Sequence, residues 1–335
     1  MRVLVALAAA AAALALPGAA FAHGKTAPVA TDFDARISAF RPAAPGVEAK
    51  VVDGDQALWL GVGRGTTVLV PGVLGEPMLR FDAHGVWLNL RSLTAQSDRI
   101  DRYDLRPSTS PTAAPLWHRL TRGHSYGWHE HRLHLLQVLA RGRRSAGALG
   151  PWSVPLVVDG RRVALDGVLL FRPPPLGWAW IGAACLLAAA LTAATLVSGA
   201  RGTQRAILYG IGATPVIWAV RIGRELYGRP TVGVVGVMSI ALTSIVGLAF
   251  LGGLLHRDRE VRLFTAFFVG FGSLYEGLTM LPVLTHATAL SALPSTLVRV
   301  CVVVFFGLGT GALVGSCAVG LRERVRHPGG RTALA

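Results

Sequence analysis

The chain has 335 residues, of which 52% are hydrophobic and only 15% are charged. This balance predicts a protein with a large membrane-embedded part and argues against an ordinary soluble enzyme. The formal net charge of +15 rests almost wholly on arginine, since Lys25 and Lys50 are the only lysines. The arginines are scattered and form no basic helix with interleaved aromatic residues, so we expect no nucleic-acid partner.

Residues 1–22 have the pattern of a secretory signal peptide. An apolar run from Val3 to Leu16 follows a basic residue, and Ala20-Phe21-Ala22 offers small residues to a signal peptidase. Cleavage at that point makes His23 the first residue of the mature protein, with a free α-amine beside its imidazole. Two such nitrogens can chelate one metal ion, and nitrogen-rich sites suit Cu(II).

The exported part, residues 23–172, is predicted to be β-structure. Val47–Val62 alternates between apolar and polar residues around Asp53-Gly54, and Asp159-Gly160 marks a second hairpin turn. Short strands at this spacing favour an antiparallel β-sandwich of immunoglobulin or cupredoxin type. Residues 94–115 are rich in Ser, Thr, Pro and Asp, and we expect a long surface loop there.

A histidine-rich segment lies at residues 124–134. If it is a strand, His129 and His131 point to the same face with Cβ atoms about 7 Å apart, which two imidazoles can span around one ion. His134 then faces the other way unless a bulge intervenes, whereas on a helix His131 and His134 would be neighbours. His124, in the loop before this segment, could supply a further ligand. We therefore predict His129 and His131 as metal ligands, with His124 and His134 as additional candidates.

These residues resemble the first cupredoxin-like domain of the B subunit of particulate methane monooxygenase. The resemblance rests on the mature N-terminal His23, on Trp128 before the pair His129 and His131, and on Gly150-Pro151-Trp152 after it. In that family, the N-terminal histidine and the His-x-His pair bind copper. The resemblance implies that His23, His129 and His131 bind copper here.

The resemblance has clear limits. It covers only the exported part of the chain. The family's subunit carries a second soluble cupredoxin domain, which this chain lacks, and has fewer membrane spans than the chain predicts. What it implies is therefore a copper site on a β domain, and not the oxidation of methane.

Residues 173–176 begin with three prolines and read as a stiff linker to a membrane domain at 177–321. A basic cytoplasmic tail, 322–335, would follow. With the N-terminal domain outside, nine arginines flank the spans on the cytoplasmic side and three on the outer side. We therefore expect a multi-pass protein of a bacterial-type plasma membrane with a cytoplasmic C-terminus. The five predicted spans are residues 177–199, 204–222, 231–255, 263–284 and 294–320.

Two charged residues lie within the predicted spans. Glu276 falls in the fourth span and Arg299 near the outer end of the fifth, so the two are predicted to be neighbours. Gly307, Gly311 and Gly315 form a stripe of small residues typical of a close contact between helices.

The sequence favours a membrane-anchored, extracytoplasmic copper-binding protein that serves copper acquisition, delivery or tolerance. Its partners would be the copper ion, the lipid bilayer, and another membrane or exported copper protein. Hydrolase motifs are missing from the exported sequence. Two alternatives stay open: a component of a copper-dependent oxidase or monooxygenase, and a metal-free interaction or assembly module.

Overall fold

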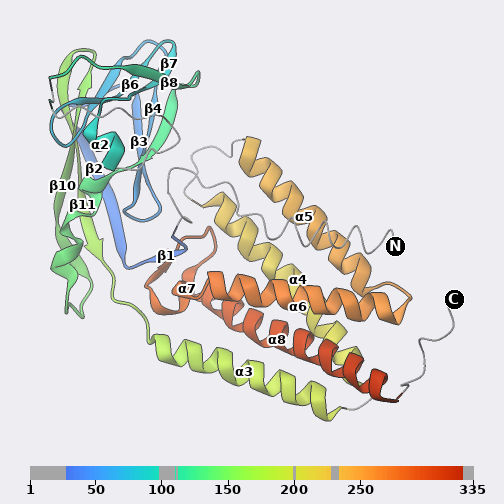
Figure 1. Cartoon of the computed structure of the whole chain (residues 1–335). Helices are drawn as coiled ribbons and strands as arrows, with labels where there is room; N and C mark the ends of the chain where they lie inside the picture. The colour runs from blue at the N-terminus through green and yellow to red at the C-terminus, as the bar shows by residue number, and fades with distance from the viewer. Residues whose placement is uncertain (1–27, 98–109, 111, 199–200, 228–233, 327–335) are drawn as a thin grey trace. The chain divides into compact units, whose positions relative to one another are not determined.

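The computed structural model describes residues 28–97, 110, 112–198, 201–227 and 234–326 (Figure 1). The described chain forms two compact units that divide between Pro173 and Pro174. We call them the β unit and the helical unit. The predicted signal peptide, residues 1–22, lies outside the described residues.

Among the described residues, the β unit has two antiparallel sheets of three or more strands. One has seven strands in the order β2-β11-β10-β5-β6-β7-β8, and the other has three in the order β3-β4-β9. The elements are β1 (Ala30–Thr31), β2 (Phe33–Arg41), β3 (Val47–Val52), β4 (Ala57–Val62), β5 (Val68–Pro71), β6 (Pro77–Asp82), β7 (Gly85–Asn89), α2 (Leu93–Ser97), β8 (Trp117–Thr121), β9 (Ser125–His129), the 3₁₀ helices η1 (His131–Leu133) and η2 (Leu135–Ala140), β10 (Gly147–Val158) and β11 (Arg161–Phe171).

Both predicted hairpin turns are present. Asp53 and Gly54 connect β3 to β4 with φ angles of 56° and 77°, and Asp159 and Gly160 connect β10 to β11 with φ angles of 48° and 79°. Only residues that tolerate positive φ fit such turns, which is why Asp-Gly marks them in the sequence. The β10–β11 hairpin is long, since its paired positions continue to Gly147 opposite Phe171.

One hydrophobic core receives side chains from both sheets. The three-stranded sheet contributes Leu58, Leu60 and Trp128, each fully buried. The seven-stranded sheet contributes residues such as Phe81 and Leu165 to the same cluster. The predicted antiparallel β architecture of the N-terminal part is thereby confirmed for the described residues. Of the predicted surface loop at 94–115, the described residues include the end of α2, a lone residue and the approach to β8.

The described part of the helical unit contains five long helices. The chain reverses direction at each one, so that α3, α5 and α8 run one way and α4 and α6 the other (Figure 1). Helix α8 packs against α3, α4 and α6. The elements are α3 (Gly177–Val197), α4 (Gly202–Leu226), α5 (Val234–Leu254), α6 (Arg259–Thr279), α7 (Pro282–Thr285), β12 (Thr288–Ala289) and α8 (Ser295–Arg326).

Four of the described helices are long and apolar enough to cross a membrane, which agrees with a multi-pass membrane protein. They are Gly177–Val197, Gly202–Leu226, Val237–Leu254 and Ser295–Ala318. The predicted span 263–284 is not among them. It divides between α6 and α7, and Arg259, Glu260 and Glu276 place charges at both ends of α6.

The glycine stripe of α8 lies at a helix contact, as predicted. A Cβ placed on Gly307 would lie 2.5 Å from Leu187 of α3, and one on Gly311 would lie 2.7 Å from Tyr209 of α4. On another face of α8, Gly309 meets α6, where Gly270 approaches the α8 backbone closely. Small residues therefore set the spacing of α8 to three neighbours.

Candidate metal centre

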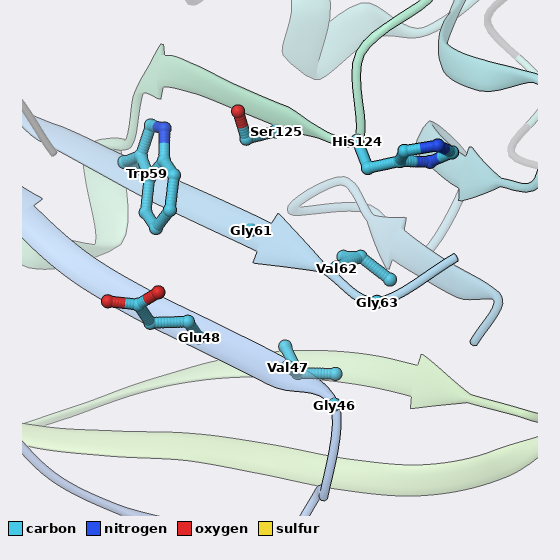
Figure 2. Close-up of a pocket in the computed structure, with 9 residues that line it drawn as sticks. All are labelled: Gly46, Val47, Glu48, Trp59, Gly61, Val62, Gly63, His124 and Ser125. Atoms are coloured by element: carbon cyan, nitrogen blue, oxygen red, sulfur yellow. The ribbon is translucent and has the colours of Figure 1, made fainter. Parts of the chain in front are cut away.

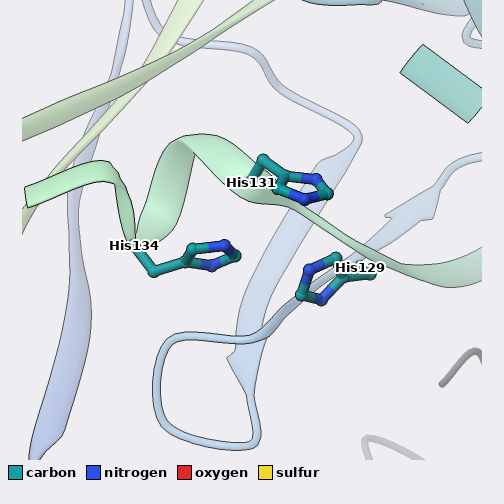
Figure 3. Close-up of side chains that lie close together, drawn as sticks. All are labelled: His129, His131 and His134. Carbon is teal, nitrogen blue, oxygen red and sulfur yellow. The ribbon is translucent and has the colours of Figure 1, made fainter. Parts of the chain in front are cut away.

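Three histidines converge where strand β9 ends. His129 is the last residue of β9, His131 begins η1, and His134 follows η1 directly. Their imidazoles face a common space (Figure 3), with ring centroids 4.6 Å apart for His129 and His131, 5.0 Å for His129 and His134, and 5.2 Å for His131 and His134. One nitrogen from each ring lies within 4.8 Å of the other two. Among the described residues, this group could hold a metal ion.

The strand-based prediction that His134 faces away from His129 and His131 is wrong. The chain leaves the strand after His129 and turns into a 3₁₀ helix, in which the His134 N–H donates to the His131 carbonyl at 3.2 Å. Residues three apart lie above one another in a 3₁₀ helix, so His131 and His134 share a face. His134, first considered an additional candidate, is a full member of the cluster.

A buried ion pair shapes this turn. The carboxylate of Glu130, only 1% exposed, accepts from Nε of Arg132 at 2.6 Å and from its terminal nitrogen at 2.6 Å. It also accepts from the indole N–H of Trp128 at 3.0 Å and caps the backbone N–H of Arg132. Because Glu130 points into the protein, the residues on either side of it, His129 and His131, turn their rings outward together.

A second group of polar residues holds His134. Its Nδ1 lies 3.4 Å from the carbonyl oxygen of Asp55, a long contact in the turn between β3 and β4. The buried Asp55 carboxylate accepts from the side-chain amides of Gln56 at 2.8 Å and Gln137 at 2.5 Å. Burial raises the pKa of the Asp55 carboxyl, although these hydrogen bonds and the nearby charge of His134 act against burial. A backbone contact at Nδ1 would leave Nε2 available as a ligand, the usual outer-shell arrangement for a metal-binding histidine.

The three imidazoles fit a transition-metal ion in chemistry and in scale. Bonds of about 2.0 Å in tetrahedral geometry place ligand nitrogens about 3.3 Å apart. Small rotations of half-buried side chains can bring nitrogens from 4.8 Å to that separation. Neutral imidazoles suit Cu, Zn, Fe and Ni, and they do not suit Mg²⁺ or Ca²⁺, which prefer oxygen ligands.

His124, predicted as a further candidate ligand, lies outside the cluster. It precedes β9, whereas His129 ends it, and five residues of strand span about 16 Å. Its Nδ1 lies 3.2 Å from the carbonyl oxygen of Asp82. His124 instead lines a shallow cavity of about 540 Å³ together with Trp59 and Glu48 (Figure 2). His23, the predicted N-terminal ligand, lies outside the described residues.

The predicted pairing of Glu276 with Arg299 is also wrong. Glu276 of α6 binds Arg221 of α4, whose Nε donates to the carboxylate at 2.6 Å. Arg299 of α8 donates instead to backbone carbonyls, those of Val283 at 3.1 Å, His286 at 2.7 Å and Ala287 at 2.5 Å. Arg299 thus satisfies backbone carbonyl groups in and just after α7, whereas Glu276 links α6 to α4.

No protein family model, curated protein or solved structure matches this chain. What the protein binds must therefore be inferred from its own residues and their geometry. Within the described chain, the three-histidine cluster is the feature with the clearest chemical meaning.

Proposed function

We propose that this protein is a membrane-anchored, extracytoplasmic copper-binding protein that serves copper acquisition, delivery or tolerance. The observation that carries the proposal is the convergence of His129, His131 and His134. Three neutral nitrogen donors from one short stretch of chain, each half-buried, form a set that copper accepts in either of its common oxidation states.

Copper is favoured over zinc by the resemblance of the exported part to a copper-binding domain. The mature N-terminus would add the amine and imidazole of His23 as further nitrogen donors. In this proposal the ion is cargo: the β unit holds it at the protein surface, and another membrane or exported copper protein gives or receives it. Half-buried ligands suit such an exchange, because the partner must reach the ion.

The residues around the cluster have separate tasks in binding. Glu130 and Arg132 keep the turn in the shape that joins the three rings, and Asp55 with Gln137 keeps His134 in place. Such outer-shell partners typically contribute a factor of about 10 to 100 in metal affinity. Binding requires unprotonated imidazoles, so affinity should fall as the solution becomes acidic.

We also propose that α6 is a fifth membrane crossing. Its outer face carries Phe271 and Leu278, both 57% exposed, which suits contact with lipid. Its charged residues lie at its first turn or, in Glu276, in an ion pair with Arg221. Five crossings also agree with the alternating helix directions in Figure 1. With an exported N-terminal domain, the C-terminus would be cytoplasmic, on the side with more arginines.

Metal analysis of the full-length protein, purified after natural processing, tests the copper proposal. Elemental analysis should find about one copper ion per chain after exposure to equal Cu and Zn, and competition with a chelator of known affinity should give the dissociation constant. His129→Ala, His131→Ala and His134→Ala should each weaken binding by about 100-fold or more, since loss of an outer-shell partner alone costs about 10- to 100-fold.

His124→Ala is the matched control, because His124 begins the same segment but lies apart from the cluster. It should leave the affinity unchanged. Preferential loading with zinc, or a loss in the control equal to the losses in the cluster variants, would contradict the proposal. A methionine placed before His23 tests the N-terminal amine: a weaker Cu(II) affinity with an unchanged Cu(I) affinity would assign the amine to the oxidised ion.

A further inference from the structure

Helix η2, which directly follows the histidine cluster, carries an exposed apolar surface. Leu135, Val138 and Leu139 are 65%, 54% and 56% exposed, a large share for aliphatic side chains on one short helix. Leu136 points the other way, packs against the hydrophobic core and reaches Gly150 of β10. The helix is therefore anchored by one leucine and presents its other apolar side chains to the surroundings.

Exposed positive charge borders this surface. Arg141, Arg143 and Arg144 follow η2 and are all exposed. Residues 131–158 contain no Asp or Glu. Apolar side chains flanked by arginines form the pattern of a segment that lies in the boundary between lipid headgroups and acyl chains. We call Leu135, Val138, Leu139 and the three arginines the η2 patch.

The covalent chain limits how far the η2 patch can be from lipid. Gly147, three residues after Arg144, pairs with Phe171. Only five residues separate Phe171 from Gly177, where the first candidate membrane helix begins. Fully extended, that connection reaches about 20 Å. Trp178, 75% exposed at the start of α3, is a residue type enriched at the membrane–water interface.

We propose that the η2 patch binds the surface of the lipid bilayer, with its leucines and valine inserted among the headgroups and its arginines bound to anionic phosphates. The functional part of this inference rests on the proposed copper site. Gln137 of η2 binds the Asp55 carboxylate, and its backbone N–H donates to the His134 carbonyl at 3.1 Å. Docking would therefore hold His134 and the cluster close to the membrane surface, where a membrane-bound copper partner could reach it.

A fluorescent probe on η2 tests this in the full-length protein. Cys185, Cys301 and Cys317 are replaced by Ala, Val138→Cys is labelled with an environment-sensitive dye, and the protein is placed in lipid nanodiscs. Lipids with a nitroxide on the acyl chain should remove most of the emission. The control is Arg161→Cys, at the opposite end of the β10–β11 hairpin. Strand β11 has 11 residues, so Arg161 lies about 36 Å along the strand from Phe171, the end nearer the first candidate membrane helix. Its emission should not change.

Lipid charge provides the second arm. Quenching at position 138 should be stronger with phosphatidylglycerol than with phosphatidylcholine alone. Replacing Arg141, Arg143 and Arg144 together by Gln should remove that preference. Equal quenching at positions 138 and 161, or none at 138 in either lipid, would overturn the proposal. A probe that is shielded from aqueous iodide without lipid quenching would show a protein contact, which also overturns it.

The two proposals fail separately. Quenching is measured without metal, so an η2 patch in lipid together with a chain that binds no copper would reject only the copper site. Copper binding with an unquenched probe would reject only the membrane contact. Leu139→Cys, labelled in the same way, is an independent second probe position on the same surface.

Discussion

Each unit of this protein buries a glutamate against an arginine, but the two pairs differ in how far they reach along the chain. Glu130 and Arg132 are two residues apart in the β unit. Arg221 and Glu276 are 55 residues apart in the helical unit. The first pair fixes the path of one turn, and the second joins two helices.

The surroundings of the two pairs differ as well. In the β unit the side chains are 10% exposed for Arg132 and 1% for Glu130, and neutral donors such as the Trp128 indole add to the pair. In the helical unit Arg221 is 25% exposed, while Glu276 is 6% exposed. A buried charge destabilises the folded state unless it is paired, so removing the arginine from either pair should destabilise the protein. The comparison suggests that the local pair shapes a site and the long-range pair maintains packing.

The largest effect is expected from Arg221→Leu. This change leaves the Glu276 carboxylate buried between α4 and α6 without its partner, which should destabilise the helical unit by about 3–5 kcal/mol. Unfolding in detergent, followed by circular dichroism at helical wavelengths, measures the loss. The exchange Arg221→Glu with Glu276→Arg should recover part of it. Arg299→Glu with Glu276→Arg should not, and recovery by that exchange would contradict the observed pairing.

Glu130→Gln tests the local pair. It removes the charge that holds Arg132 and should cost about 1.5–3 kcal/mol, the range for hydrogen bonds to charged groups. It should also weaken metal binding by about 10- to 100-fold, because the turn that joins the rings of His129 and His131 loosens. Arg221→Leu should leave metal affinity unchanged wherever the protein is still folded. Equal metal affinity in both variants would break the distinction between the pairs.

Gly270→Ala tests whether the stability of the helical unit depends on close contact between helix backbones as well as on the Arg221–Glu276 ion pair. A Cβ at this position would lie 2.6 Å from the backbone nitrogen of Leu313, which cannot move alone. We expect a loss of about 1–3 kcal/mol, the usual cost of overpacking. Gly182→Ala is the control, since nothing lies within 4 Å of its Cβ, and it should be neutral or slightly stabilising. The same unfolding assay compares both.

Local signals predicted much of the fold. Asp53-Gly54 and Asp159-Gly160 revealed two hairpins, because so few residues accept positive φ. Long apolar runs predicted the four helices that are long and apolar enough to cross a membrane, since a span needs about 20 such residues. The fourth predicted span, residues 263–284, met this test poorly, because Glu276 and the charges at the start of α6 lowered its hydropathy.

The site was predicted only in part. The spacing of His129 and His131 predicted two ligands, but the position of His134 depends on where the strand ends, and hydrophobic alternation does not mark that boundary. The sequence signal for the end of the strand is Glu130. Its carboxylate caps the first turn of η1 by accepting from the Arg132 N–H, and acidic residues are common at such helix starts. Arg221 was missed as the partner of Glu276 because helix packing, and not depth in the membrane alone, decides which charges meet.

The smallest effect is expected at Glu76, a buried glutamate whose described partners are neutral hydrogen-bond donors. Burial alone would raise the pKa of Glu76, but hydrogen bonds from the Thr94 N–H and the Ser92 hydroxyl, at 2.9 Å and 2.8 Å, outweigh it and lower the pKa. An acid whose pKa is lower in the folded state stabilises the fold at neutral pH, and that contribution disappears as the pH falls through the folded pKa.

Glu76→Gln should therefore destabilise the β unit by about 1–2 kcal/mol at pH 7 and by progressively less below about pH 4. Tryptophan fluorescence during urea unfolding of the full chain, repeated from pH 7 to pH 3, measures the difference. Glu48→Gln is the control, because that glutamate is exposed and forms a surface ion pair with Lys50. If the difference in the free energy of unfolding between the unaltered protein and the Glu76→Gln variant stays constant with pH, the prediction is contradicted. Neutral hydrogen-bond donors would then not be enough to stabilise the ionised form of a buried glutamate in this protein, in contrast to the arginine partners of Glu130 and Glu276.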